Sequence, residues 1–288
     1  MTFRSKVLMR AEELKVVLES LGKRPTKRLG QNFLLDERVI ERQVGYAQLS
    51  PADTVLEIGP GLGNLTEVLL KTGARVVAVE QDPVFCQFLR KRFGDSVALT
   101  QADAVKAFLP QFNKVVSNLP YQISSPITFK LLETGFDIAV VMLQREFAER
   151  MIAKPGTHEY GRLSVGVYYR ADCDIMLNVS RTAFWPQPKV DSCVVRLVPR
   201  RPPFVVKDER AFYDVTKAIF SHRRKKISNS IRMDPAVSAY VDENTSKKLD
   251  GLPFASKRAE ELTPEMIGEL TDALLELSLS STSSGSKS

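Results

Sequence analysis

The chain of 288 residues contains few of the side chains that most often transfer protons or bind metals: two histidines, three cysteines and one tryptophan. His158 and His222 stand in unlike surroundings, and the sequence has neither an H-E-x-x-H motif nor a Cys/His cluster, so it offers no recognisable metal site. The G-x-S-x-G motif of hydrolases is also missing. These absences argue against metal-dependent and serine-hydrolase chemistry.

Long apolar runs and paired cysteines are missing as well. No stretch approaches the ~20 apolar residues that a membrane-spanning helix needs, and residues 1–10 are too polar for the core of a signal peptide. Cys86, Cys173 and Cys193 are odd in number and lack C-x-x-C spacing, which is typical of buried thiols in a reducing compartment. We therefore expect a cytoplasmic protein. The net charge of +7 and the pI near 9.3 suit a polyanionic partner.

The most informative segment that is present is Asn118-Leu119-Pro120-Tyr121. It follows an apolar pair that predicts a buried strand, so it should lie at the carboxyl end of that strand, where open α/β sheets bind ligands. The amide of Asn118 and a backbone carbonyl of Leu119 or Pro120 can accept both hydrogens of an exocyclic amine. Tyr121 offers a flat face on which a base can stack. A simple turn is the alternative, because Asn and Pro both terminate strands.

A glycine-rich turn stands earlier in the chain. Gly59, Gly61 and Gly63 follow an apolar strand at residues 54–56, and glycine lets a ligand approach the backbone because no Cβ intrudes. The G-x-G-x-G spacing differs from the G-x-G-x-x-G of dinucleotide-binding proteins, since Asn64 stands where the last glycine would be.

Acidic residues follow the next two predicted strands. Glu80 follows the run at residues 75–79 and can accept hydrogen bonds from both hydroxyls of a ribose. Asp103 follows residues 97–100 and can meet an adenine amine, with a helix N-cap as the alternative. A glycine turn, two acids and Asn118, each closing a successive strand, predict a site for S-adenosylmethionine rather than a nicotinamide dinucleotide, and Asn118 should border both cofactor and target base.

With these motifs the sequence resembles the ribosomal RNA adenine dimethyltransferases from Arg28 to about Leu197. The resemblance is carried by RLGQNFL at residues 28–34, the glycine turn, NLPYQISSP at 118–126, QREFAER at 144–150, YGRLSV at 160–165 and FWPQPKVDS at 184–192. Within that family it is most similar to the small-subunit enzymes, which dimethylate two adjacent adenosines near the 3′ end of the RNA. YGRLSV, PQPKVDS and the long helical end favour that branch over the large-subunit resistance methylases.

The resemblance implies transfer of methyl groups from S-adenosylmethionine to the N6 amine of adenosine. It implies that Gln31, Asn32 and Leu34 fold over the cofactor and that Phe184 closes the second face of the target base; the alternatives are a helix start for the first segment and plain core for Phe184. A sulfonium makes its methyl group electrophilic, so the protein needs only to hold the amine in line, which positioning and electrostatics achieve without a proton relay.

Periodicity and composition divide the chain into four segments. Residues 1–24 should be an N-terminal extension with a short amphipathic helix, and residues 25–203 a Rossmann-like α/β methyltransferase domain with a mostly parallel, doubly wound sheet. A Pro-Arg-Arg-Pro-Pro stretch marks its end. Residues 204–277 predict a small all-helical domain whose last helix begins near Thr263. Residues 278–288 are rich in serine and are expected to be disordered.

Two basic clusters are candidates for RNA contacts. One consists of Arg223, Arg224, Lys225 and Lys226; the other consists of Lys27 and Arg28 together with nearby basic residues, close to the predicted cofactor site. Both can bind phosphates without reading base sequence. A solvated helix face or a turn is the alternative for the first cluster. The expected partner is the small ribosomal subunit with its RNA, and the expected state is a monomer.

The sequence leaves three other functions open. A DNA adenine methyltransferase would normally carry a second proline where Leu119 stands, and a large-subunit methylase shares most of the motifs. A non-catalytic nucleic-acid-binding factor on the same fold could dispense with Asn118, Glu80 and Asp103. All three are present, which favours an active enzyme.

Overall fold

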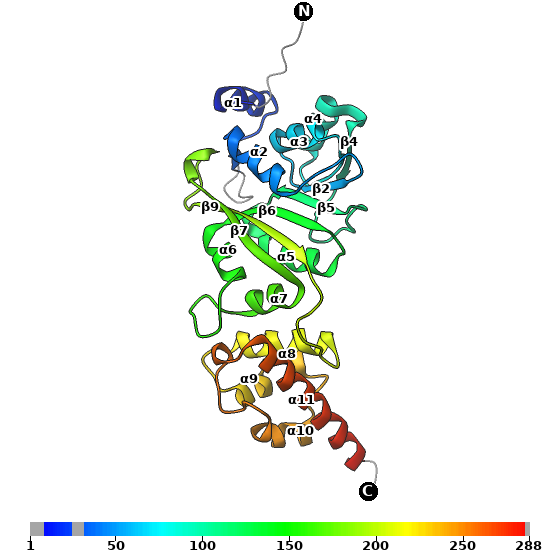
Figure 1. The fold of residues 1–288 in the computed structure, drawn as a ribbon, viewed down its shortest axis with the longest axis vertical. Coiled ribbons are helices and arrows are strands. Elements are labelled where there is room, and N and C mark those ends of the chain that lie inside the picture. Colours follow the sequence, from blue (N-terminus) through cyan, green and yellow to red (C-terminus); the bar gives the residue numbers. More distant parts are fainter. Residues whose placement is uncertain (1–8, 25–31, 286–288) are drawn as a thin grey trace, which may run out of the picture. The chain divides into compact units, whose positions relative to one another are not determined.

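The computed structural model describes residues 9–24 and 32–285, and the chain forms two compact units (Figure 1). The first unit comprises the chain up to Ala148 together with Asp172–Pro199, and the second comprises Glu149–Ala171 and the chain from Arg200 onward. Among the described residues, none of the helices combines the length and the apolar character that crossing a membrane requires.

A seven-stranded sheet forms the centre of the first unit. Its strands are β2 (Thr54–Ile58), β3 (Arg75–Glu80), β4 (Val97–Gln101), β5 (Lys114–Asn118), β6 (Ile138–Gln144), β7 (Ala171–Val179) and β9 (Ser192–Pro199), in the order β4-β3-β2-β5-β6-β9-β7. Strands β2 to β6 pair in parallel, and β9 runs antiparallel to β6. The interior strands are nearly continuous runs of buried apolar residues, as expected for a sheet covered on both faces. The predicted doubly wound class is confirmed.

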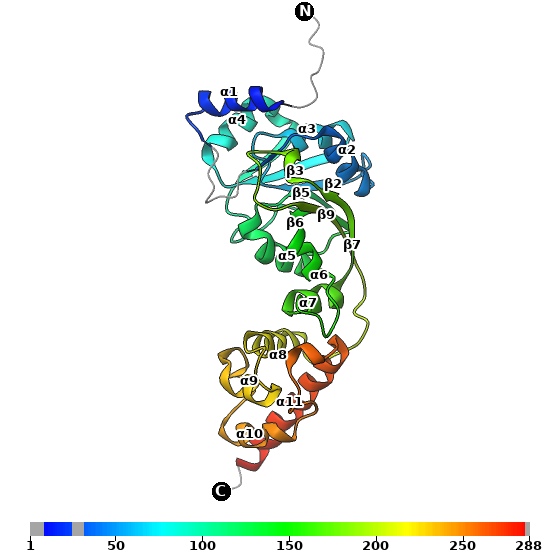
Figure 2. The same ribbon diagram turned by 90° about the vertical axis from the view of Figure 1, so that its left-hand side faces the viewer.

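Helices cover both faces of this sheet. In the two views of Figures 1 and 2, α2 (Glu37–Tyr46) and α3 (Asn64–Lys71) lie on one face, and α5 (Ser124–Glu133) lies on the other. Ile40 from α2 and Leu69 from α3 are fully buried against strand residues such as Val116 and Val140. Helix α4 (Pro83–Phe93) packs against the β3–β4 edge, and α6 (Arg145–Met151) leads from the first unit into the second.

The strand order creates a crevice at one edge of the sheet. Strands β2 and β5 are neighbours although β3 and β4 lie between them in the sequence, so the chain leaves β2 toward one side of the sheet and leaves β5 toward the other. At such a switch point the loops after the two strands diverge, and ligands bind between them. The glycine turn follows β2, and Asn118 is the last residue of β5. The fold therefore places both predicted motifs at this crevice.

An N-terminal helix and a pair of two-residue strands complete the first unit. Helix α1 (Ala11–Ser20) forms where the N-terminal helix is predicted, and its Leu14 and Leu18 are buried in a cluster with Leu62 and Phe85. Strand β1 (Phe33–Leu34) pairs antiparallel with β8 (Phe184–Trp185), which places Leu34 opposite Phe184. Two segments far apart in the sequence thus meet beside the crevice.

The second unit is helical and has its own core. Its helices are α7 (Arg162–Arg170), α8 (Glu209–Ser221), α9 (Ile227–Met233), α10 (Glu243–Lys248) and α11 (Pro264–Gly285). Tyr160 and Tyr169 are buried in one cluster with Phe212 and Ile219 of α8. The segment Glu149–Ala171 therefore belongs with the helices, whereas the sequence placed it in the 25–203 domain. The aromatic side chains around α7 can only be buried by α8 and α11, and their sequence spacing does not show this.

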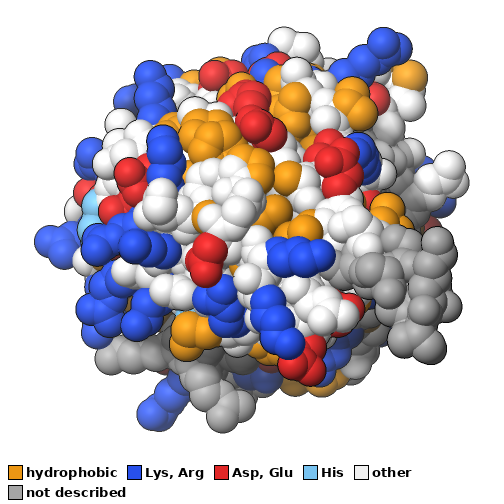
Figure 3. Space-filling model, turned by 90° about the horizontal axis from the view of Figure 1, so that it is seen from below, with side chains coloured by type: hydrophobic (Ala, Val, Ile, Leu, Met, Phe, Trp, Pro, Cys, Tyr) orange, Lys and Arg blue, Asp and Glu red, His pale blue; other side chains and the backbone are white. Residues whose placement is uncertain are grey.

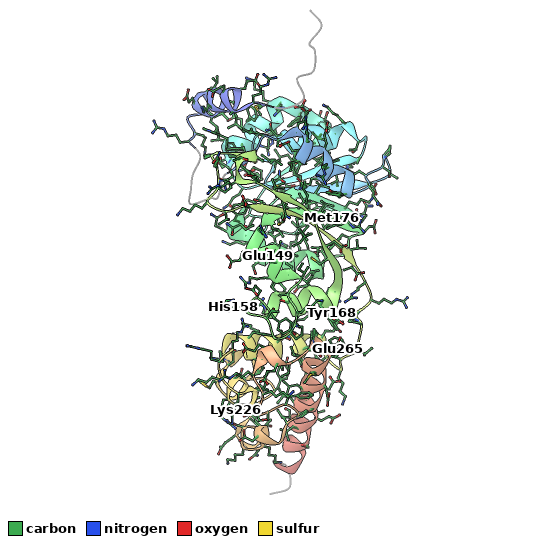
Figure 4. The ribbon with its side chains drawn as sticks, turned by 60° about the vertical axis from the view of Figure 1, so that its left-hand side comes forward. Glu149, His158, Tyr168, Met176, Lys226 and Glu265 are labelled. Atoms are coloured by element: carbon green, nitrogen blue, oxygen red, sulfur yellow. The ribbon has the colours of Figure 1, made fainter. Side chains whose placement is uncertain are left out.

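Side-chain contacts fasten α7 to the rest of that unit. Tyr168 of α7 and Glu265 of α11 lie beside each other in Figure 4, and the tyrosine Oη donates to the glutamate Oε1 at 2.7 Å. Tyr160 Oη donates to the carbonyl of Leu262 at 3.0 Å. Helix α11 begins after Thr263, whose Oγ1 accepts from the amide of Met266 at 3.3 Å, as the predicted capping position requires.

The last helix is longer than the composition predicts. Helix α11 continues to Gly285, so the backbone of residues 278–285 is helical where the composition predicts disorder. Extending an existing helix adds one hydrogen bond for each residue that is fixed, so serine-rich sequence can follow a packed start. Short 3-10 segments within the described residues lie at Gly94–Ser96, Tyr121–Ile123, Arg181–Ala183, Pro235–Val237, Leu249–Gly251 and Ala259–Glu261.

Candidate active site

A cavity of about 320 Å³ opens at the switch point between β2 and β5. Its lining includes most of the residues that the motifs single out: Asn32, Leu34, Gly59, Gly61, Glu80, Asp103, Asn118, Leu119, Pro120, Tyr121 and Phe184. Three predicted residues, Gln31, Lys27 and Arg28, lie outside the described part of the chain. The structure thus brings residues from 32 to 184 into one site, although their individual roles stay predictions.

The turn after β2 needs glycine because its φ angles are positive and because a Cβ would come close to neighbouring side chains. Gly59 and Gly61 have φ angles of +70° and +58°, and a Cβ on Gly59 would lie 3.4 Å from Cδ of Pro120. The two loops of the crevice therefore touch at this point. Gly63 ends the turn and directly precedes α3 with a φ of +82°, and a Cβ on it would lie 2.5 Å from Cε2 of Phe93. It shapes the start of the helix and does not line the cavity.

Glu80 is held in a fixed orientation at the end of β3. Its Oε2 accepts from the amide of Gly61 at 3.1 Å, and its Oε1 accepts from the amide of Asp82 at 2.9 Å. Burial raises the pKa of this carboxyl, and the hydrogen bonds from the two amides work in the opposite direction. A carboxylate oxygen can accept more than one hydrogen bond, so both oxygens retain capacity for ribose hydroxyls.

Glu57 is a second acid in the cavity wall, and sequence reasoning gave it no role. Its side chain is 2% exposed, and its Oε2 accepts from Oγ1 of Thr66 at 2.6 Å. Burial raises the pKa of Glu57 to about 8, the hydrogen bond from Thr66 lowers it, and the nearby charge of Glu80 raises it further. The carboxyl is therefore mostly protonated at neutral pH. The sequence did contain a signal for Glu57, because an acidic residue inside an apolar strand, just before the glycine turn, indicates a functional position.

Asp103 both caps a turn and faces the cavity. Its Oδ1 accepts from the amide of Val105 at 2.9 Å, and the amides of Lys106 and Ala107 donate to its carbonyl at 3.0 and 2.9 Å. No helix begins at Asp103, so the helix N-cap alternative is wrong in that form; the residue stabilises a turn and also lines the cavity.

Asn118 presents an acceptor for which the described residues provide no donor. Its Oδ1 is buried and makes no hydrogen bond within the described part of the chain. A buried acceptor without a partner costs about 1–3 kcal/mol, so such atoms are rare unless a ligand completes them. The neighbouring amide of Leu119 is already used, donating to the carbonyl of Met142 at 3.3 Å. This amide therefore does not supply the missing donor, and the amide oxygen of Asn118 can accept from a ligand.

Two aromatic side chains border the same region. Tyr121 Oη and Ser192 Oγ are 2.8 Å apart, which fixes the ring, and burial raises the pKa of Tyr121 while the hydrogen bond to Ser192 lowers it. Phe184 is 5% exposed and lines the cavity. The core alternative for Phe184 is thus correct as well, because a residue of the cavity wall is also packed from behind.

The predicted basic cluster of the helical unit divides into two parts. Arg223 is bound within that unit: its Nε donates to Glu260 Oε2 at 2.8 Å, its Nη2 to the carbonyl of Thr157 at 2.9 Å and its Nη1 to the carbonyl of His158. Residues 224–226 are exposed, and Lys226 is labelled in Figure 4. Figure 3, a view onto this unit, shows Lys and Arg side chains gathered on one side of the face. Arg223 thus acts mainly in the structure of the loop, and residues 224–226 remain the candidates for RNA.

No group of three or more His, Cys, Asp or Glu side chains in the described ranges is arranged to hold a metal ion. The cavity instead contains amide groups, carboxyl groups and aromatic faces, which suit a nucleoside and an amine.

Comparisons with known proteins identify the family. The model of the ribosomal RNA adenine dimethylase family matches residues 22–268. A probable ribosomal RNA small subunit methyltransferase A from Methanosarcina acetivorans is 47% identical over 251 residues, which cover 86% of this chain and 93% of the relative. A protein of the same description from Pyrococcus abyssi is 42% identical over 267 residues, covering 92% and 97%.

Solved structures agree. The crystal structure of a dimethyladenosine transferase from Plasmodium falciparum has a TM-score of 0.70 at 30% identity, and covers 83% of this chain and 95% of that one. The 23S rRNA methyltransferase ErmE has a TM-score of 0.60 at 28% identity, covering 84% and 99%. The chain belongs to the ribosomal RNA adenine dimethylase family, and it is an enzyme that uses S-adenosylmethionine to dimethylate adenine in ribosomal RNA.

Proposed function

We propose that the substrate of this enzyme is the RNA of the small ribosomal subunit, where it dimethylates the N6 amines of two adjacent adenosines near the 3′ end during ribosome assembly in the cytoplasm. The names and identities of the relatives favour this substrate: proteins named as small-subunit methyltransferases are 42% and 47% identical, whereas the 23S rRNA methyltransferase ErmE is 28% identical.

The single observation that carries the chemistry is the buried Oδ1 of Asn118, which has no donor among the described residues. It ends β5, and Pro120 beside it touches the glycine turn of the opposite loop. An adenine N6 amine can donate one hydrogen to this oxygen and the other to a backbone carbonyl of Leu119 or Pro120. Both bonds hold the nitrogen in one orientation, which is what an in-line transfer requires.

The residues of the cavity fit the cofactor. S-adenosylmethionine, when bound, supplies a methyl group on a positively charged sulfur. Glu80 would accept from the ribose hydroxyls, Asp103 from the adenine amine, and the backbone at Gly59 would border the methionine part. Asn32 and Leu34 would cover the cofactor from the β1 side. This assignment is supported by their shared cavity and by the two amide hydrogen bonds that orient Glu80.

Tyr121 and Phe184 would enclose the target base. Base–aromatic stacking contributes about 1–3 kcal/mol per face, which can offset the few kcal/mol needed to extrude a base. The contact between Tyr121 and Ser192 holds one ring in place, and the β1–β8 pairing holds the other. The exposed residues 224–226 would bind the RNA backbone, and Lys27 and Arg28 are proposed as a second contact.

The test is a methylation assay with defined substrates. Wild-type enzyme, Asn118→Ala and Asn244→Ala would each be incubated with labelled cofactor and unmethylated small subunits, large subunits or duplex DNA, followed by mass analysis of the nucleosides. Asn244 is an exposed asparagine of α10 and serves as the control. We expect dimethyladenosine in small subunits with wild type and control. With Asn118→Ala we expect none, while cofactor affinity stays within about tenfold, a change of ~1.4 kcal/mol.

Each other outcome contradicts part of the proposal. Product only in large subunits would mean a 23S-type methylase, and product only in DNA would mean a DNA enzyme. Full activity of Asn118→Ala would remove Asn118 from its proposed role. A wild-type protein that labels no nucleic acid would contradict the substrate assignment as a whole.

A further inference from the structure

Lys130 makes an unusual set of contacts for a lysine outside the cavity wall. From α5, its ammonium donates to the carbonyls of Ala104 at 2.8 Å, Val105 at 3.1 Å and Ala107. An ammonium has three N–H donors, so these three carbonyls use its full capacity. The acceptors all belong to one turn, which follows β4 and carries Asp103.

The turn is otherwise held by Asp103 itself. Its carboxylate and its carbonyl accept from the amides of Val105, Lys106 and Ala107, and the amide of Ala102 donates to the carbonyl of Glu80 at 2.9 Å. Three amides of the turn are thus bound within it, and the three carbonyls of Ala104, Val105 and Ala107 accept from a side chain of another element. Removing that side chain would leave several carbonyls without their charge-assisted hydrogen bonds, and the turn would have to rearrange.

We propose that Lys130 is a positioning residue for cofactor recognition, which fixes the turn so that Asp103 presents its second carboxylate oxygen to the adenine amine. The inference rests on the proposed role of Asp103 at the adenine. Helix α5 begins at Ser124, directly after the 3-10 turn that contains Tyr121. The same helix therefore starts at the segment that receives the target base and ends beside the turn that receives the cofactor adenine.

Lys106 provides a matched control within the same turn. Its ammonium lies 3.9 Å from Asp103 Oδ2, but its side chain is 85% exposed, so solvent screens the contact. Lys106→Met removes the same charge as Lys130→Met and leaves the three carbonyl contacts in place. A difference between the two variants therefore reports the contacts and not the charge.

The experiment measures discrimination for the 6-amino group of the purine. Calorimetry would give the dissociation constants of S-adenosylhomocysteine and of its analogue whose purine lacks that amino group, for the full-length wild type, Lys130→Met, Lys106→Met, Asp103→Ala and the double variant of Lys130 and Asp103. Wild type and Lys106→Met should prefer the amino-bearing ligand by about tenfold or more, the worth of one charge-assisted hydrogen bond. Lys130→Met and Asp103→Ala should each reduce that preference to within about threefold, and the double variant should lose no more than Asp103→Ala alone.

The ratio separates positioning from general stabilisation, because a merely structural role would weaken both ligands equally and leave the preference unchanged. An unchanged ratio in Lys130→Met, or losses that add in the double variant, would overturn the inference. If Asp103→Ala also keeps the preference, the adenine role of Asp103 fails and the inference fails with it, while methyl transfer to RNA is judged separately by the nucleoside assay. Should Lys130→Met not fold, Lys130→Gln, which keeps a donor for the turn, is measured by the same ratio.

Discussion

Replacing Glu57 with glutamine should change how the stability of the first unit depends on pH. Burial raises the pKa of the Glu57 carboxyl from 4.5 to about 8 in the folded protein, so the folded state keeps a proton that the unfolded chain releases above pH 4.5. Between these two values the unfolded state binds fewer protons, and the free energy of unfolding falls as the pH rises. Glutamine is nearly isosteric, does not titrate, and can still accept from Thr66.

The size of the effect follows from the shift. One pKa unit corresponds to about 1.4 kcal/mol. At pH 7 the variant should therefore be more stable than wild type by about 3 kcal/mol, and above pH 8 by about 5 kcal/mol. Near pH 4.5 the two proteins should have the same stability. The difference should grow steadily across this window and then stay constant.

Urea unfolding at several pH values measures this difference. Trp185 is the only tryptophan of the chain and lies in β8 of the same unit, so its fluorescence reports the relevant transition. Glu41→Gln, at an exposed position of α2, is the control and should show no such growth. A stability difference between Glu57→Gln and wild type that stays flat from pH 5 to pH 8.5 would refute the reasoning.

Three further predictions concern the cofactor, the fold and the RNA. Glu80→Gln should weaken cofactor binding by about tenfold or more in calorimetry, because charge-assisted hydrogen bonds to the ribose are lost; unchanged affinity would remove its ribose role. Gly63→Ala should lower the free energy of unfolding by about 2 kcal/mol more than Gly156→Ala, because both glycines have a φ of +82° but only Gly63 has a side chain within 3 Å of the added Cβ. Neutralising residues 224–226 should reduce the slope of log RNA affinity against log salt concentration by about one per charge removed. Arg223→Ala should chiefly lower the thermal stability of its unit. If wild type and the neutralised variant have identical slopes, residues 224–226 are solvated surface.

The sequence predicted those parts of the fold that depend on local pattern. Apolar runs such as that of β6 mark strands by themselves, and the carboxyl ends of parallel strands meet at one edge of a sheet, so Glu80 and Asn118 could be expected near the same ligand. The family resemblance added Phe184, whose distance in sequence from the other residues carries no spatial information. Its pairing with Leu34 through β1 and β8 supplies that information.

The sequence could not predict features that depend on contacts between residues far apart in the chain. The motif gives Gly63 a place in the cofactor turn, but it does not show that the ring of Phe93 from α4 also leaves no room for a Cβ there. Tyr169 looks like part of the catalytic domain until α8 is seen to bury it. Lys130 has an unremarkable place in a helical pattern, and only the fold brings its ammonium to the turn of Asp103.

The scarcity of histidine agrees with the chemistry that the cavity allows. The residue at the proposed target amine is an amide, which does not titrate. The neighbouring hydroxyl of Tyr121 has a raised pKa because it is buried, so it stays neutral across the physiological range and cannot take up a proton there. These groups can orient an amine and exclude water, but they cannot act as a general base. Because the sulfonium releases a neutral thioether when the nitrogen takes its methyl group, orientation of the nitrogen is sufficient for the transfer. The positive charge passes to the methylated nitrogen, which then loses its extra proton to solvent, so no side chain at position 118 has to act as a base.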